Sequence, residues 1–401
     1  MTAANPAVAE TAPAGAAARS GALGYEAWRA TRFFSCLDGL RAISILAVVW
    51  HHAGGGTLPS VGLSRGFLGV DVFFAISGFL IVTLLLRERD RHGGISLRGF
   101  YARRSLRIFP VYYAFLFGIA GAYALLKPDD PTTGDILASL PAAAFYVSNF
   151  VVIPAGLLHV TWSLATEEQF YMLWAPAEKF LRKAGVYVLL AAVIAASLAV
   201  SFGLLDPWIG AVYGYDEAGV VNLPSVLGTT LLPIALGVVL AHLLHAPRGF
   251  AAVRRVAGFP GAPAFWFVAV CLGIFLVPGD IRGLTRPLLQ LGMVLALAAL
   301  LLRDDGPLGR SLRWKPLARI GVVSYGIYLF HKPVLVAVEA AFAGLGLPGR
   351  TDGLPGTVLL TIAAAAATWG VSELSFRFFE MPFLKLKKRF ATTQAGAADV
   401  R

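Results

Sequence analysis

The chain has 401 residues, of which 57% are hydrophobic and only 14% are charged, and its mean hydropathy is +0.70. Soluble domains usually carry about 25% charged residues, so this composition excludes an ordinary soluble enzyme and predicts a membrane protein. The net charge of +11 would suit a nucleic-acid-binding protein, but the basic residues are spread over short segments between apolar runs, which argues against nucleic acid as a partner.

Apolar runs of the length needed to cross a bilayer, roughly 20 residues, recur along the chain. They predict an all-α fold, a polytopic membrane helix bundle of about ten transmembrane helices with membrane lipids around it. The predicted spans are 39–57, 67–86, 108–126, 159–178, 185–205, 223–244, 263–279, 286–302, 320–341 and 355–379.

The distribution of Lys and Arg predicts the orientation of these spans. With the N-terminus inside, the inside segments hold 26 Lys and Arg residues and the outside segments hold five. The positive-inside rule therefore places both termini in the cytoplasm, and we expect a multi-pass protein of a bacterial-type inner (plasma) membrane. We predict a disordered cytoplasmic tail over residues 1–32, which are rich in Ala, Pro and Gly, a membrane domain over 33–385 and a cytoplasmic tail over 386–401.

The first span carries Arg41 near its cytoplasmic side and His52 in its outer half. Eleven residues are three helical turns plus about 20°, so the two side chains share a face and lie roughly 16 Å apart along the axis. Ionisable residues inside a membrane are candidates for a functional site. The alternative is that Asp38 neutralises Arg41 at the helix entrance while His51 and His52 lie at the headgroups.

The second span carries Asp71 in its outer half and Ser77 near its middle. Asp71 belongs either to a site or to the cap of the helix. Gly69 and Gly78, with Ser77, are typical of close packing between membrane helices.

The third span begins with three arginines, Arg103, Arg104 and Arg107, at its cytoplasmic entrance. Guanidinium groups match the geometry of phosphate oxygens, so the three residues predict a phosphate clamp. Contact with anionic lipid headgroups is the alternative.

In the fourth span, Ser163, Glu167 and Tyr171 fall on one helical stripe. Glu168 points about 100° away from Glu167, so we expect only one glutamate to face a given site. The alternative is a pair of carboxylates at the outer headgroups. In the ninth span, His331 lies at a depth similar to that of His52, which makes it a candidate for the same site. The alternative is that His331 is a packed, hydrogen-bonded histidine without a role in catalysis.

Together these positions predict a basic cluster toward the cytoplasm and a titratable cluster toward the outside. A phosphorylated donor would enter among the arginines. A neutral His52 would remove a proton from an acceptor hydroxyl, and Glu167 would orient its imidazole.

Five segments resemble the integral-membrane acyltransferase-3 family: residues 37–42 with His52, then 66–80, 103–110, 162–171 and 324–331. The resemblance spans roughly residues 33–385. It implies transfer of an acyl group, most often acetyl, from acyl-CoA to a hydroxyl. The implied partners are acyl-CoA and a carbohydrate or glycolipid acceptor, such as surface polysaccharide, lipopolysaccharide or peptidoglycan, with a macrolide-type small molecule as the alternative.

The resemblance also implies residue roles. His52 matches the family's essential histidine, Arg41 its partner and Glu167 the glutamate after Trp-Ser-Leu; Arg103, Arg104 and Arg107 match the family's basic motif. The supporting residues are Asp38, Asp71, Ser77, Trp162, Ser163, Tyr171 and His331. We expect no metal. The sequence leaves open the choice between His51 and His52, a covalent acyl-His step and the oligomeric state. A transporter or flippase of an anionic lipid or sugar is the competing function.

Overall fold

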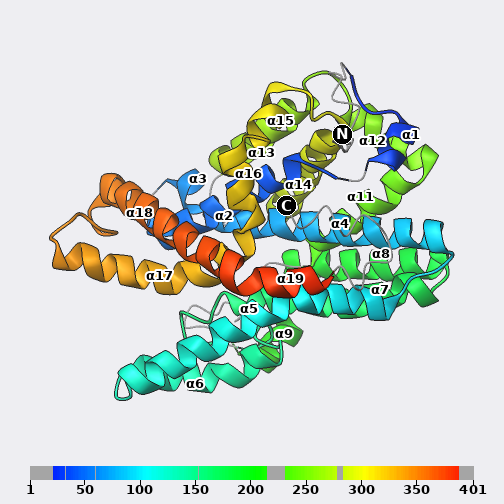
Figure 1. The fold of residues 1–401 in the computed structure, drawn as a ribbon. Coiled ribbons are helices and arrows are strands. Elements are labelled where there is room, and N and C mark those ends of the chain that lie inside the picture. Colours follow the sequence, from blue (N-terminus) through cyan, green and yellow to red (C-terminus); the bar gives the residue numbers. More distant parts are fainter. Residues whose placement is uncertain are drawn as a thin grey trace, which may run out of the picture.

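The computed structural model describes residues 21–387, apart from 32, 59, 152, 215–230 and 278–282. In this part of the chain every regular element is helical, which confirms the predicted all-α fold (Figure 1). Six helices are long and apolar enough to cross a membrane, or seven if a pair bent by 115° forms one span. The protein is therefore a multi-pass membrane protein.

Each of the ten predicted spans overlaps one longer α-helix, but the structure supports only six or seven of them as membrane crossings. The other three are α2 and α13, which are short, and α7, which contains three glutamates. The ten helices are α2 (Cys36–His52), α4 (Gly69–His92), α5 (Leu97–Leu126), α7 (Thr161–Phe180), α8 (Lys183–Ser201), α11 (Leu232–His245), α13 (Ala262–Leu276), α14 (Thr285–Leu302), α17 (Ser324–Gly344) and α18 (Gly353–Leu374).

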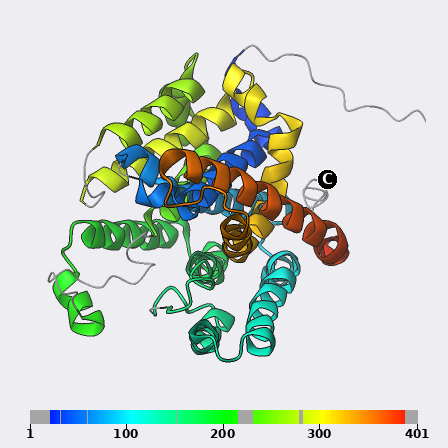
Figure 2. The ribbon, with the colours of Figure 1, turned by 90° about the vertical axis from the view of Figure 1, so that its left-hand side faces the viewer.

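Shorter helices connect these ten. Figures 1 and 2 show α6 beside α5 at the bottom of the molecule and α13 at the top. The connecting elements are α1 (Tyr25–Ala30), η1 (Gly55–Thr57), α3 (Val61–Ser64), η2 (Gly66–Leu68), α6 (Pro131–Ala144), α9 (Asp206–Tyr213), α12 (Pro247–Ala257), α15 (Pro307–Leu312), α16 (Lys315–Val322), the π-helical η3 (Ser375–Glu380) and α19 (Met381–Lys387).

Helix α4 is the centre of the bundle and packs against α2, α7, α11 and α14. Its contact with α11 depends on glycine: a Cβ on Gly78 would collide with the carbonyl of Ile234, and one on Gly237 with the carbonyl of Ala75. Small residues that let membrane helices approach closely are a common basis of their packing. The predicted packing role of Gly78 is therefore confirmed.

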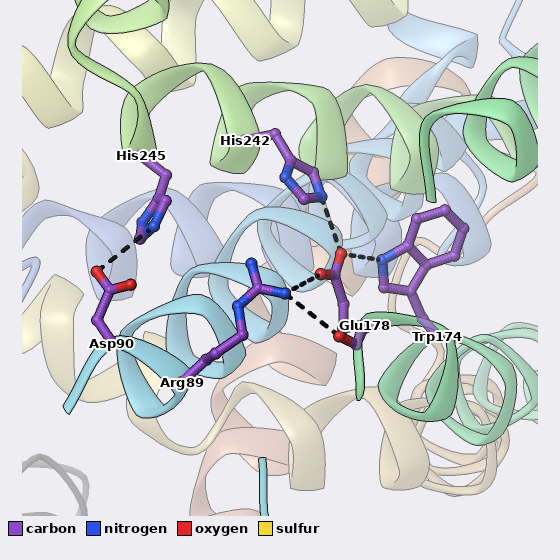
Figure 3. Close-up of polar contacts among 6 residues, drawn as sticks. All are labelled: Arg89, Asp90, Trp174, Glu178, His242 and His245. Carbon is purple, nitrogen blue, oxygen red and sulfur yellow. Dashed lines mark hydrogen bonds and ion pairs between the residues drawn. The ribbon is translucent and has the colours of Figure 1, made fainter. Parts of the chain in front are cut away.

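A polar cluster ties α4, α7 and α11 together where all three end (Figure 3). The buried Glu178 accepts hydrogen bonds from His242 (2.8 Å) and from Trp174 (3.1 Å), and its backbone carbonyl accepts one from Arg89 (3.3 Å). We call this end of the bundle, where α4 ends and α5 begins, the basic end. The opposite end, where α2 ends at His52, is the histidine end.

The described part of the predicted N-terminal tail is folded. Trp28 on α1 is 2% exposed, and Arg87 of α4 donates hydrogen bonds to the carbonyls of Thr31 (2.6 Å) and Trp28 (3.2 Å). The hydroxyl of Tyr25 donates to the carbonyl of His245 (2.6 Å). The prediction of disorder is thus wrong for residues 21–31, because Tyr25 and Trp28 pack against the helix bundle. Residues 1–20 lie outside the described part of the chain.

Candidate active site

A cavity of about 260 Å³ opens into the bundle, lined by residues of α2, α4, α5, α7 and α17. Along α4 its lining extends from Glu88 at the basic end to Val70. The eighteen residue steps between Val70 and Glu88 correspond to about 27 Å at 1.5 Å per step, so the cavity is long and narrow.

The charges of the cavity gather toward the basic end. Five arginines line it against three carboxylates, which makes the lining net positive. The arginines are Arg41, Arg87, Arg103, Arg104 and Arg107, and the carboxylates are Asp38, Glu88 and Glu167. The structure therefore brings the three arginines of the predicted phosphate clamp, together with Arg41 and Asp38, to one cavity. Arg103 forms an ion pair with Glu88 at 3.2 Å.

Arg104 is held from several sides. Its Nε donates to Glu168 at 3.2 Å, its Nη2 lies 4.0 Å from Glu167, and its guanidinium carbon lies 3.1 Å from the centroid of the Tyr171 ring. Ser77 donates a 2.6 Å hydrogen bond to the other oxygen of Glu167. Of the two glutamates only Glu167 lines the cavity, while Arg104 contacts both. Glu168 was not among the predicted site residues.

At the histidine end, His52 and His331 form a pair. Nε2 of His331 lies 3.2 Å from Nδ1 of His52, and the ring centroids are 4.9 Å apart. Two backbone carbonyls fix the rings: that of Val48 lies 3.0 Å from Nδ1 of His52, and that of Tyr328 lies 2.7 Å from Nδ1 of His331. A carbonyl only accepts, so both Nδ1 atoms carry hydrogens in the neutral rings and both Nε2 atoms carry lone pairs.

This arrangement gives His52 a defined chemistry. Its Nδ1–H faces the carbonyl and the lone pair of His331, and its Nε2 is left to accept a proton. When Nε2 takes a proton, the adjacent lone pair of His331 stabilises the resulting imidazolium. The structure thereby corrects one predicted pairing. Glu167 was predicted to orient His52, but in the described part of the chain it contacts Ser77 and Arg104. The residue next to the His52 imidazole is His331.

The neighbouring His51 points elsewhere. Its Nδ1 lies 2.9 Å from the carbonyl of Ser64, and its ring packs edge-on against Phe67 at 5.4 Å. His51 therefore fastens α2 to the segment that precedes α4, while His52 faces α17.

Asp71 lies outside the cavity lining. It is fully buried and binds Arg286 through two hydrogen bonds of 3.1 Å and Gln290 through one of 3.0 Å. It makes no side-chain cap at the start of α4. Both earlier interpretations of Asp71, as a member of the titratable cluster and as a helix cap, are corrected to that of an ion pair between α4 and α14.

The cavity and the histidine pair are separated by one layer of side chains. Ser163 and Tyr328 line the cavity, whereas His52 and His331 do not. The hydroxyl of Ser163 donates to that of Tyr328 at 2.7 Å, and the Tyr328 ring lies 5.7 Å from that of His331. The Trp162 ring packs edge-on against Phe74, another residue of the cavity lining. Within the described residues, no group of three His, Cys, Asp or Glu side chains is placed to hold a metal ion.

Known proteins resemble this chain over most of its length. The family model of the acyltransferase domain called acyltransferase-3 matches residues 34–373. The peptidoglycan O-acetyltransferase OatA of Listeria monocytogenes is 30% identical over 379 residues, which cover 88% of this chain and 56% of that protein. The putative peptidoglycan O-acetyltransferase YrhL of Bacillus subtilis is 30% identical over 391 residues, covering 88% and 55%.

A putative O-acetyltransferase of Staphylococcus aureus is 29% identical over 391 residues, covering 90% of this chain and 59% of its own length. The chain thus spans little more than half the length of these relatives. No solved structure matches it.

Proposed function

This chain belongs to the acyltransferase-3 family, and from that premise we propose that it is a membrane O-acyltransferase. The proposed reaction moves an acyl group, normally acetyl, from cytoplasmic acyl-CoA to a hydroxyl of a cell-envelope carbohydrate. Peptidoglycan is the first acceptor to test, because two of the relatives are named for it. The observation that carries the proposal is a single net-positive cavity that leads from five arginines to within one side-chain layer of the His52–His331 pair.

The donor enters at the basic end in this proposal. The excess of Lys and Arg in the predicted inside segments assigns that end to the cytoplasm. Arg41, Arg103 and Arg107 hold the phosphates, and the cavity takes the slender thioester arm. Arg104, packed on Tyr171 between two glutamates, positions α5 against α7.

Transfer then takes place at the histidine end. Nε2 of His52 accepts the proton of the acceptor hydroxyl as the oxygen attacks the thioester carbonyl, so that a C–O bond forms and the C–S bond breaks. The imidazolium, stabilised by His331, returns the proton to the departing thiolate. The Ser163–Tyr328 contact must open to admit the acyl group. A covalent acyl-His52 intermediate is the variant of this mechanism.

The test uses the full chain, purified in lipid nanodiscs, with labelled acetyl-CoA and soluble peptidoglycan fragments. We expect free thiol to appear only when both are present, label to reach the fragment, and His52→Ala to abolish both. If no hydroxyl acceptor, whether glycan or macrolide, produces thiol release, the proposal is wrong. Movement of a lipid or sugar across the bilayer without thiol release would favour the transporter.

A further inference from the structure

Phe33 is an aromatic side chain at the open end of the cavity without an aromatic partner. It lines the cavity, is 51% exposed and makes no ring contact with any other described residue. The adjacent Phe34 differs: its ring stacks on Trp28 at 5.2 Å, and Arg87 lies 5.5 Å above it. Phe34 is therefore a packed residue, whereas Phe33 presents its ring to the cavity mouth.

The backbone on either side of Phe33 is anchored. The hydrogen bonds of Arg87 hold the carbonyls of Thr31 and Trp28 just before it, and α2 begins at Cys36 just after it. A half-exposed aromatic ring on an anchored backbone is a preorganised surface for a flat ligand.

The size of the cavity indicates which part of the donor lies next to the Phe33 ring. Pockets that enclose a drug-sized ligand hold about 300–1,000 Å³, and this cavity holds about 260 Å³. Acyl-CoA is larger than such a ligand, so the cavity has room for the narrow acyl-pantetheine arm, and the nucleotide must remain at the mouth. There Phe33 offers a π-face, and Arg87 and Arg103 supply positive charge.

We propose that Phe33 is the stacking platform for the adenine base of the acyl-CoA donor. This inference rests on the proposed function and deepens it, because it assigns the nucleotide end of the substrate to a residue outside the arginine motif. Stacking of a base on an aromatic side chain contributes about 1–3 kcal/mol by alanine substitution, which corresponds to about 5- to 150-fold in affinity. A competing explanation is that Phe33 anchors the protein at the lipid interface, where aromatic residues are enriched.

The experiment compares two donors, acetyl-CoA and acetyl-pantetheine, which has the same thioester and arm but no nucleotide. We expect Phe33→Ala and Phe33→Leu to raise the KM for acetyl-CoA by about 5- to 150-fold, with little change in the KM for acetyl-pantetheine. Phe33→Trp should restore the value for acetyl-CoA. Phe117→Ala is the matched control, since Phe117 is 54% exposed and does not line the cavity.

Leucine retains the apolar surface and loses the π-face, so an unchanged KM in Phe33→Leu would indicate a lipid anchor and overturn the inference. An equal rise of KM for both donors would overturn it as well. Failure of the wild-type protein to consume acetyl-CoA contradicts the proposed function itself. Normal consumption with an unaltered KM in Phe33→Ala contradicts this inference alone.

Discussion

Nε2 of His331 lies 3.2 Å from Nδ1 of His52, although 279 positions separate the two residues in the chain. The contact joins α2 to α17, and a backbone carbonyl fixes each ring from behind. The pair thus has the form of a base with an orienting partner, in which the partner is a second histidine and not a carboxylate.

His331→Ala should reduce kcat without changing the KM for acetyl-CoA, because His331 holds His52 and does not line the cavity. We expect a loss below the 10²- to 10⁴-fold typical of removing a general base, which His52→Ala should show. His331→Gln keeps an oxygen that can accept from His52 and should recover part of the activity. Equal activity of the Ala and Gln variants would argue for a purely packing role.

His51 provides the matched control for His52. His51→Ala removes one hydrogen bond to the Ser64 carbonyl, worth about 1 kcal/mol. It should lower the melting temperature slightly and leave acceptor-dependent thiol release near the wild-type rate. If His51→Ala abolished turnover while His52→Ala did not, the assignment of the base would have to be exchanged.

Arg104→Ala should destabilise the protein as well as weaken the site. Removing one partner of a buried ion pair typically costs about 3–5 kcal/mol, and Glu168 would be left without its guanidinium. Arg104→Ala combined with Glu168→Gln should regain much of the melting temperature without regaining activity. Thermal unfolding in detergent, measured beside thiol release, separates the two effects; full recovery of activity in the double variant would show that Arg104 serves only to neutralise Glu168.

Asp71→Ala should lower the stability of the protein and leave its catalytic rate nearly unchanged. The change leaves Arg286 and Gln290 without their buried acceptor, with a cost of about 3–5 kcal/mol. The melting temperature should fall, while kcat per folded molecule should stay within a few-fold of wild type. A variant that melts normally and has lost activity would return Asp71 to the catalytic site.

Tyr328→Ala should widen the range of acyl chains that the enzyme accepts. The Tyr328 ring separates the cavity from the histidine pair, but it is the Tyr328 backbone carbonyl that holds His331, so this variant keeps that hydrogen bond. One methylene of fit is worth about 10- to 200-fold in discrimination. We therefore expect kcat/KM for butyryl-CoA relative to acetyl-CoA to rise at least tenfold. An unchanged ratio would place the chain-length filter elsewhere.

The sequence was sufficient to predict the helices but not their partners. Long apolar runs identify a membrane helix because the bilayer imposes both its length and its composition. The pairing of His52 with His331 depends on how α2 and α17 are rotated and inclined within the bundle. These orientations cannot be predicted from the local sequence of either helix. A similar depth in the membrane was the one feature of the sequence that grouped His331 with His52.

One further difference between prediction and structure has a simple physical origin. The N-terminal segment appeared disordered because Ala, Pro and Gly dominate residues 1–30, yet Tyr25 and Trp28 supply enough apolar surface to dock it.

The length of the cavity along α4, about 27 Å, is close to the roughly 30 Å of a bilayer's hydrocarbon core. In the proposed reaction the phosphates and the nucleotide stay at one face, and only an uncharged two-carbon unit completes the crossing. Moving a charge through the membrane potential requires about 2.3 kcal/mol per 100 mV, and a neutral acetyl group bears none of it. Passage of the acetyl group across the membrane and formation of the ester would then be a single event. Its rate would be independent of the voltage across the membrane.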